Sequence, residues 1–399
     1  MKILIAPDSF KESLEAIEVR RAIQSGFNQV FPNADYSLLP MADGGEGTSA
    51  VLSYALGGRW KNVFVNDPLM RPITAKYLLL ENETAMIEIA QACGLHLLTN
   101  EERNPLITSS YGVGELIADA LDEGVKRIII GLGGSATNDA GLGMLMALGM
   151  IFCDDEGTPL AQGGSELANL QQIDGAKLHP KLQDTVFEVA CDVTNPLCGE
   201  SGASAIFGPQ KGASPEQVAL LDKALSHFAM VSGQQGYQDC QNISGAGAAG
   251  GLGYALMTFC GANLKSGFDT VAETVSLEEH IASADLVITG EGKLDAQTLM
   301  GKVAGGISMM AKANGKPIIA ICGSVDTLNP TQTTGFDVVM PSIQKLDTLD
   351  NVLNNAYENI ETTAVNIAAA MKLGQSIGQR ISPQVNSLTT IKSKYRYSL

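Results

Sequence analysis

The chain of 399 residues has few cations and no long apolar segment. Lysine and arginine together number 26 against 43 aspartates and glutamates, which gives a net charge of −17. A negative field of this size repels polyanions, so we expect neither nucleic acid nor an anionic membrane as a partner. No stretch offers the roughly 18 uncharged apolar residues that a membrane span requires. The first apolar run ends at Pro7 and Asp8, too early for a signal peptide, and we therefore expect a cytoplasmic protein.

Common metal and nucleotide motifs are also missing. The four histidines are scattered, and no two of the seven cysteines have zinc-binding spacing. A P-loop is excluded because Gly301-Lys302 is followed by Val303 rather than by serine or threonine, and the required upstream glycine is Ala296. Any anion site must therefore be built from backbone N–H groups and a few placed cations.

The apolar segments at the two ends of the chain predict a parallel sheet. Residues 2–6 and 36–42 are strand-like, and between them the apolar residues of 16–30 recur at the three- and four-residue steps of a helix. Strand-like runs return at 285–289 and 317–322. Strands that alternate with helices pair in parallel, and the loops at their carboxyl ends gather at one edge.

The middle of the chain has a different pattern, since closely spaced strand-like runs between residues 61 and 90 indicate antiparallel pairing. We therefore predict an α/β protein with a discontinuous Rossmann-like or flavodoxin-like parallel-sheet domain, residues 1–80 plus 280–375. A mixed α/β domain, residues 81–279, is inserted into it. Residues 383–399 are polar and lack apolar periodicity, so we expect a loosely ordered tail.

A glycine-rich loop follows the apolar run 128–132. Gly133 and Gly134 carry no side chains, so their N–H groups can approach a phosphate closely. Ser135, Thr137 and Asn138 add hydrogen-bond donors, and Asp139 could hold a metal ion that bridges phosphates. A tight strand-to-helix turn with ordinary capping is the alternative.

Two segments match dinucleotide-binding patterns. Residues 131–136 fit the permissive form G-x-G-x-x-A, and Asp154 and Asp155 follow about 20 residues later, as a ribose-binding acid would. Residues 245–250 fit G-x-G-x-x-G, but the polar segment 238–244 before them is no strand. A closely packed helix rich in glycine and alanine is therefore the favoured interpretation of the second match.

Charged residues follow four apolar runs. They are Asp8 with Lys11, Asp43 with Glu46, Asp192, and Glu291 with Lys293 and Asp295. Each alone is commonly a turn or cap residue. At the carboxyl ends of parallel strands they would converge, and phosphoryl transfer needs these residue types: carboxylates for Mg²⁺, a carboxylate for the hydroxyl proton, and cations for the phosphates.

In their order along the chain, six segments resemble the type-1 glycerate kinases of bacteria. They are residues 6–11, 41–47, 131–139, 191–197, 247–253 and 289–295. The resemblance covers roughly residues 1–375 and implies ATP-dependent phosphorylation of D-glycerate, with 2-phosphoglycerate favoured over 3-phosphoglycerate as the product beside ADP. It also implies the discontinuous Rossmann-like domain. Two departures are the tail from Pro383 and Glu12, where a small residue such as glycine is expected.

The expected site combines these segments. ATP phosphates would bind Gly133, Gly134, Ser135, Ala136, Thr137 and Asn138, and Mg²⁺ would bind carboxylates drawn from Asp139, Glu291 and Asp295. Lys11 and Lys293 would meet the glycerate carboxylate or the transferring phosphoryl group. Asp192 is the expected base for the glycerate hydroxyl, with Asp295 in reserve. Further expected substrate ligands are Asp8, Ser9, Asp43 and Asn195.

Three alternatives remain open. An NAD-dependent dehydrogenase of small hydroxy acids shares the fold class, but none of the four histidines lies in a strand-end motif to serve as its catalytic residue. A kinase for another small alcohol is suggested because residues 131–136 are similar to the Gly-Leu-Gly-Ser-Ser-Ala loop of the galactokinase–homoserine kinase group. A two-lobed binding protein without turnover is the third. The sequence leaves the oligomeric state open, a homodimer included.

Overall fold

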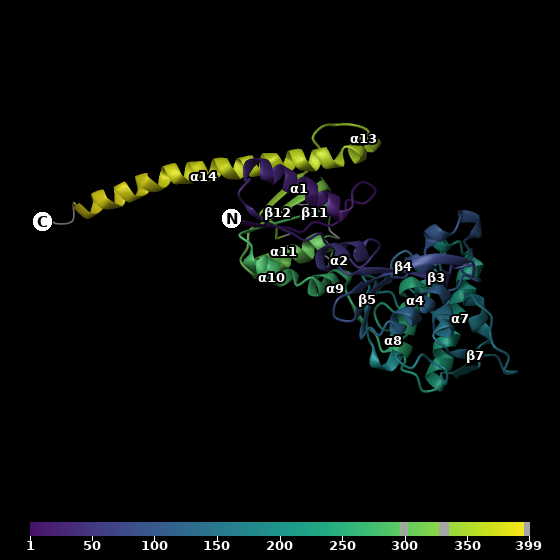
Figure 1. Ribbon diagram of the computed structural model, residues 1–399. Coiled ribbons are helices and arrows are strands. Elements are labelled where there is room, and N and C mark those ends of the chain that lie inside the picture. Colours follow the sequence, from purple (N-terminus) through teal and green to yellow (C-terminus); the bar gives the residue numbers. More distant parts are fainter. Residues whose placement is uncertain (296–297, 299–301, 327–334, 395–399) are drawn as a thin grey trace. The chain divides into compact units, whose positions relative to one another are not determined.

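The computed structural model describes residues 1–295, 298, 302–326 and 335–394 (Figure 1). The chain forms two compact units, Met1–Pro40 with Glu278–Leu399 (unit 1) and Met41–Leu277 (unit 2). The chain passes from unit 2 back to unit 1 after Leu277, and the boundary expected there was residue 280. The first boundary lies well before residue 80, because the strands between residues 59 and 80 pair within the sheet of unit 2. The predicted class, an α/β protein with a parallel sheet, is confirmed.

Unit 1 contains a five-stranded sheet in the order β13-β12-β11-β1-β2, in which every neighbouring pair is parallel. Its strands are β1 Lys2–Ile5, β2 Asp35–Leu38, β11 Leu286–Leu294, β12 Ile318–Val325 and β13 Val338–Pro341. Its helices are α1 Ala16–Val30, α10 Leu277–Ser283, α11 Val303–Ala313, α13 Leu349–Asn354 and α14 Ala356–Lys394. The sheet lies between α1 and α14 on one face and α11 on the other (Figure 1). β1 and β11 are neighbours although their sequences are far apart, which brings the charged residues that follow both strands to one edge.

Helices α1 and α14 lie side by side over the sheet of unit 1 (Figure 1). Their contact is close because Gly26 has no side chain: a Cβ atom there would lie 2.6 Å from the Cβ of Ala364. Ile23, Phe27 and Ile360 are fully buried between these helices and the strands. α14 continues as helix through residues 383–394, where we expected loose order, and its end extends beyond the sheet. A helix outside the core does not require an apolar face, so periodicity could not reveal it.

Unit 2 contains a six-stranded sheet in the order β10-β9-β6-β5-β4-β3. The strands are β3 Arg59–Asn66, β4 Pro72–Leu80, β5 Thr84–Glu88, β6 Arg127–Gly131, β9 Val186–Ala190 and β10 Asn263–Lys265, and β7 Ile151–Cys153 pairs with β8 Gln172–Asp174. The helices are α2 Thr48–Leu56, α3 Ala90–Cys93, α4 Tyr111–Asp122, α5 Leu142–Ala147, α6 Ala203–Phe207, α7 Pro215–Gln234, α8 Ala248–Cys260 and α9 Gly267–Thr274. The four strands from β5 to β10 are parallel, and β3 and β4 are antiparallel. The mixed pairing expected for the inserted domain is therefore present.

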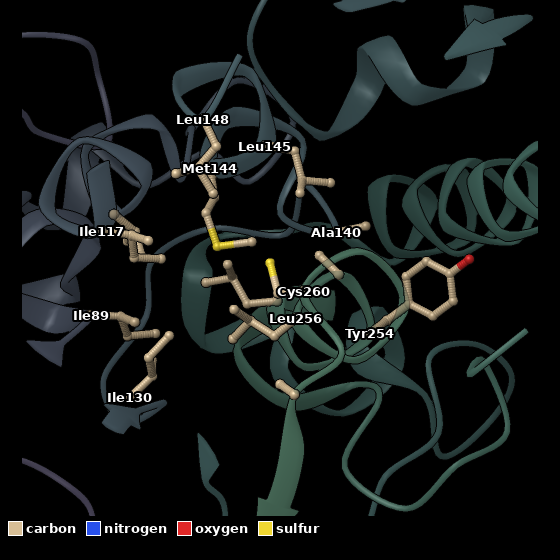
Figure 2. Close-up of a cluster of buried hydrophobic side chains, with 14 of the residues drawn as sticks. Ile89, Ile117, Ile130, Ala140, Met144, Leu145, Leu148, Tyr254, Leu256 and Cys260 are labelled. Atoms are coloured by element: carbon tan, nitrogen blue, oxygen red, sulfur yellow. The ribbon is translucent and has the colours of Figure 1, made fainter. Parts of the chain in front are cut away.

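The core of unit 2 joins its helices to its sheet. Figure 2 shows Ile130 of β6, Ile117 of α4, Met144 of α5 and Leu256 of α8 in one cluster, and all four are fully buried. The covering helices hold the strands in place, so the loops that leave β6 and β9 have fixed origins.

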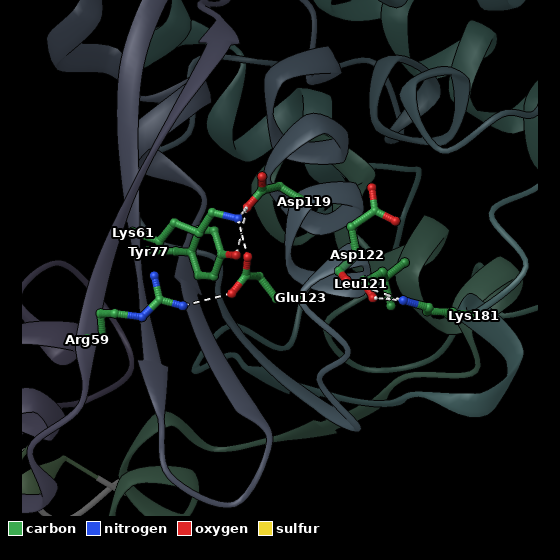
Figure 3. A network of polar contacts seen from close by, with 8 residues as sticks. All are labelled: Arg59, Lys61, Tyr77, Asp119, Leu121, Asp122, Glu123 and Lys181. Atoms are coloured by element: carbon green, nitrogen blue, oxygen red, sulfur yellow. Dashed lines mark hydrogen bonds and ion pairs between the residues drawn. The ribbon is translucent and has the colours of Figure 1, made fainter.

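A polar network joins β3 and β4 to the end of α4 (Figure 3). Lys61 Nζ lies 2.8 Å from Asp119 Oδ2 and 2.7 Å from Glu123 Oε1, and Arg59 also pairs with Glu123 at 2.7 Å. The hydroxyl of Tyr77 donates to Asp119 Oδ2 at 2.8 Å. Burial of Tyr77 and its bond to Asp119 raise the pKa of this phenol, so it stays protonated and donates.

Candidate functional site

A pocket of about 250 Å³ lies in unit 2, where loops leave the carboxyl ends of β6 and β9. Leu132 to Ser135 follow β6, Cys191 to Val193 follow β9, and Asp43 to Gly45 precede α2. Ala190, Phe207, Gln210, Lys211, Ala248 and Ala249 complete the lining. We call this cavity the unit 2 pocket. It brings together five residues predicted from the sequence, namely Asp43, Gly133, Gly134, Ser135 and Asp192.

Close backbone contacts shape the unit 2 pocket. Gly44 has a φ of +83°, and a Cβ atom there would lie 2.5 Å from the Cβ of Ala190 at the end of β9. A Cβ atom on Gly131 would lie 2.5 Å from the carbonyl oxygen of Gly44. Only glycine fits both positions, and this lets the loop that carries Asp43 lie directly against β6 and β9.

Only the first half of the glycine-rich loop faces the pocket. Gly133, Gly134 and Ser135 line it, whereas Thr137 and Asn138 are fully buried. Asn138 Nδ2 donates to Ser204 Oγ at 2.8 Å. The prediction that Ala136, Thr137 and Asn138 contact phosphate is therefore not supported by the geometry, since the loop turns into the core after Ser135. Residues 245–250 pack closely on the loop, as expected, since a Cβ atom on Gly250 would lie 2.0 Å from the carbonyl oxygen of Thr137. They do not form the regular helix that was expected, because Ala249 and Gly250 have left-handed backbone conformations.

Asp139 was a predicted metal ligand, but its carboxylate is occupied. The side chain is fully buried. Oδ2 accepts hydrogen bonds from Ser110 N, Ser110 Oγ and Gly143 N, and Oδ1 accepts one from Gly141 N. These bonds join the loop to the starts of α4 and α5. The geometry thus favours a structural role for Asp139.

Asp192 follows β9 and lines the unit 2 pocket. Its Oδ1 accepts a hydrogen bond from Gly267 N at 2.9 Å. Desolvation by the surrounding protein raises the pKa of the carboxyl, the negative charges of Asp43 and Asp269 raise it further, and the Gly267 bond opposes the shift. A carboxylate with a raised pKa that faces a cavity is a candidate proton acceptor.

Asn195 does not line the unit 2 pocket. Its Nδ2 donates to Ser201 O at 2.7 Å, and its carbonyl oxygen accepts from Gly247 N at 2.9 Å. The side chain predicted to bind substrate is therefore bonded within the loop that leads to α6, and the backbone of Asn195 holds this loop against the segment before α8.

Lys211 was missed by the sequence analysis and lies in the wall of the unit 2 pocket. Its side chain is buried, and Nζ donates to Ser135 Oγ at 2.9 Å and to Thr137 O at 2.7 Å. Burial lowers the pKa of this ammonium group to about 8. The residue ends the short 3₁₀ helix Pro209–Lys211, before Gly212 in a left-handed conformation. Lys211 lies between two helices and follows no strand, so a search for charged residues at strand ends does not find it. The Gly-Pro and Lys-Gly turns around it are the available signal.

In unit 1, the residues expected at strand ends lie near one edge of the parallel sheet. Asp8, Ser9 and Lys11 follow β1, and the N–H of Asp8 donates to Gly290 O in β11 at 2.9 Å. Glu291 and Lys293 lie inside β11, which is longer than predicted, and Asp295 follows it. We call Asp8, Ser9, Lys11, Glu291, Lys293 and Asp295 the unit 1 cluster.

Glu291 is the buried acid of the unit 1 cluster. Its Oε1 accepts from Thr298 Oγ1 at 2.6 Å. Burial raises the pKa of the carboxyl, and the charges of Lys302 and Lys11 oppose this shift. Lys293 is exposed and lies 3.9 Å from Asp295 Oδ2 and 3.6 Å from Asp326 Oδ2. The positive charges of Lys11 and Lys302 near this buried carboxylate favour the binding of an anion.

No group of three or more histidine, cysteine, aspartate or glutamate side chains suited to a metal ion occurs among the described residues. Mg²⁺ needs less than this from a protein, because it is usually held by one or two carboxylates together with substrate phosphates and water. The oxygen donors of Glu291 and Asp295 fit that requirement. Within the described part of the chain, no helix is both long and apolar enough to cross a membrane.

An α/β fold with carboxylates and lysines near the carboxyl ends of its parallel strands is typical of enzymes that act on small anions. The model of the glycerate kinase family matches residues 3–372, and the chain belongs to this family. The predicted resemblance and the predicted enzyme class, a kinase, are both confirmed.

Relatives match over nearly the whole chain. A glycerate kinase from Haemophilus influenzae is 50% identical over 93% of this chain and 99% of its own length. A glycerate 2-kinase from Escherichia coli is 48% identical over 94% of this chain and 99% of its own length. The crystal structure of a protein described as glycerate kinase 2 from Salmonella typhimurium is similar with a TM-score of 0.87 at 49% identity, covering 94% of this chain and 99% of that one.

Proposed function

We propose that this enzyme transfers the γ-phosphate of ATP to the 2-hydroxyl of D-glycerate, giving 2-phosphoglycerate and ADP. The observation that carries the proposal is that Asp192, a carboxyl with a raised pKa, and Lys211, a buried cation, line the same pocket. A hydroxy acid needs both, one for its hydroxyl and one for its charge. The name of the 48% identical relative, a glycerate 2-kinase, supports the choice of the 2-hydroxyl over the 3-hydroxyl.

Asp192 is the proposed base. It accepts the proton of the attacking hydroxyl while the hydrogen bond from Gly267 N holds the carboxylate in place. A positioned base contributes roughly 10²- to 10⁴-fold to the rate. Asp43 lies in the same pocket, and its Oδ1 accepts a 3.1 Å hydrogen bond from Gly45 N. We assign Asp43 to binding the 3-hydroxyl of the acid.

The unit 1 cluster is the proposed source of metal ligands and phosphate-binding cations. Glu291 and Asp295 would hold Mg²⁺, which when bound neutralises charge on the phosphates. Lys11 and Lys293, already predicted from the sequence, would bind phosphate oxygens. Lys302, whose charge also acts on Glu291, is a further cation for this role.

ADP release from ATP and Mg²⁺ in the presence of D-glycerate tests the proposal, with phosphorus NMR to identify the product. Coupling of the phosphorus to one proton indicates 2-phosphoglycerate, and coupling to two indicates 3-phosphoglycerate. Absence of ADP release, together with NADH binding, would replace the proposal by the dehydrogenase. Binding of D-glycerate without any turnover would favour the binding protein instead.

A further inference from the structure

Lys211 is a buried cation that forms no ion pair within the part of the chain that the structure describes. Its side chain is 1% exposed. Two of its three ammonium protons are used, toward Ser135 Oγ and Thr137 O, and both acceptors are neutral. Within the described ranges no ion pair joins Lys211 to a carboxylate, and Asp139 attracts it only from beyond ion-pair distance. One N–H donor of the lysine therefore remains for a ligand in the unit 2 pocket.

A buried ammonium group without an anion is costly, because desolvation disfavours the charged form. The same desolvation lowers the pKa of Lys211. An anionic ligand beside Nζ would remove the imbalance. Ser135 supports this role: its Oγ accepts from Lys211, so its own proton is free to point at the same ligand.

We propose that Lys211, Ser135 and the N–H groups of Gly133 and Gly134 bind the carboxylate of the hydroxy acid substrate. This inference rests on the proposed function. It assigns the preference for an acid over an uncharged alcohol to Lys211. Asp43 and Asp192 line the same pocket as Lys211. Two carboxyl groups and one ammonium group disfavour a highly charged triphosphate much more than a singly charged acid with two hydroxyl donors.

The assignment changes the expected place of ATP. The sequence analysis put the ATP phosphates on Gly133 to Asn138, but only the first three residues of that loop face the pocket. We instead assign Gly133, Gly134 and Ser135 to the carboxylate of the acid. The phosphates are left to the lysines of the unit 1 cluster.

Two variants of Lys211 test the inference by steady-state kinetics. Lys211→Met removes the charge and keeps the length, and Lys211→Gln retains amide donors without charge. Both should raise the KM for D-glycerate about 10- to 100-fold, leave the KM for ATP unchanged, and abolish the preference for binding D-glycerate over glycerol in calorimetry. Lys181→Met is the matched control, because Lys181 Nζ also donates to a backbone carbonyl, that of Leu121 at 3.0 Å, outside the pocket (Figure 3).

An unchanged KM for D-glycerate with a raised KM for ATP would overturn the inference and leave the proposed function intact. Failure of the wild-type enzyme to phosphorylate D-glycerate would instead refute the proposed function, while calorimetry with D-glycerate still reports on Lys211. If both variants lose their circular dichroism spectrum, Ser135→Ala decides, because it removes one proposed donor to the carboxylate and keeps the lysine. This variant should raise the KM for D-glycerate and leave the KM for ATP unchanged; the reverse pattern contradicts the inference.

Discussion

Lys211 Nζ lies 2.9 Å from Ser135 Oγ and 2.7 Å from the carbonyl oxygen of Thr137. One lysine thus fixes the glycine-rich loop on both sides of the point where it leaves the pocket for the core. The side chains that surround this ammonium group set its protonation. Burial lowers its pKa, and Cys93 and Asp139 oppose this shift, while Asp43 and Asp192 line the same pocket.

A first prediction concerns pH. Burial lowers the pKa of Lys211 from its usual value to about 8, so the cation is present below pH 8 and is lost as the pH rises through that value. The KM for D-glycerate should therefore be constant from pH 6.5 to 7.5 and rise about tenfold per pH unit well above pH 8. The KM for ATP should not follow. In Lys211→Gln the rise should vanish, and its persistence would show that another group titrates.

Replacement of Asp192 by asparagine should lower kcat by about 10²- to 10⁴-fold, because the amide cannot take the hydroxyl proton. The hydrogen bond from Gly267 N can be retained by the asparagine oxygen, so folding and nucleotide binding should stay close to wild type. Initial rates of ADP release measure kcat, and calorimetry with ADP measures nucleotide binding. Asp222→Asn, in α7 and outside the pocket lining, is the control. A near-normal kcat for Asp192→Asn would exclude it as the base.

Asp139→Ala should destabilise unit 2 without changing the response to Mg²⁺. Removal of the carboxylate leaves the buried donors Ser110 N, Gly141 N and Gly143 N without their acceptor. A loss of about 2–5 kcal/mol is expected in urea unfolding. A stable variant with a greatly increased Mg²⁺ requirement would restore the metal role predicted from the sequence.

Glu291→Gln should increase the Mg²⁺ concentration needed for half-maximal activity. The glutamine oxygen can still accept from Thr298 Oγ1, so the local structure is kept while the charge that would hold the metal is removed. Titration of activity with MgCl₂ measures the change. Glu358→Gln, in the first turn of α14, is the matched control. Equal Mg²⁺ curves for Glu291→Gln and wild type would exclude Glu291 as a ligand.

Tyr77→Phe should lower the free energy of unfolding by about 1 kcal/mol, because the hydroxyl donates to Asp119 in the network of Figure 3. Activity should be unaffected, since neither residue lines the unit 2 pocket. Urea unfolding of this variant, of Asp119→Asn and of the double variant measures the coupling. Additive losses would mean that the bond contributes nothing.

Much of the architecture was predictable because apolar periodicity records burial. Residues 2–6 and 16–30 correspond closely to β1 and α1. The early domain boundary was not found in this way: the runs between residues 61 and 90 indicated antiparallel pairing, but not that residues 59–80 pair through β4 and β5 within the sheet of unit 2. Periodicity shows that a strand exists but not which sheet it joins.

The candidate site was predictable where a charged residue or a glycine loop follows a strand. Asp43, Asp192 and Gly133 were found by this rule and share a pocket. Asp139 and Asn195 satisfied the same rule, yet their side chains are used in hydrogen bonds within the fold, and sequence does not show where a side chain points. Lys211 escaped the rule because it follows a helix.

The most direct test of the account is the initial rate of ADP formation from ATP and Mg²⁺, measured with and without D-glycerate and with glycerol in its place. The account predicts ADP formation that depends on D-glycerate, yields 2-phosphoglycerate, and is far slower with glycerol. ADP formation that proceeds equally with glycerol, or that does not respond to D-glycerate, would contradict it.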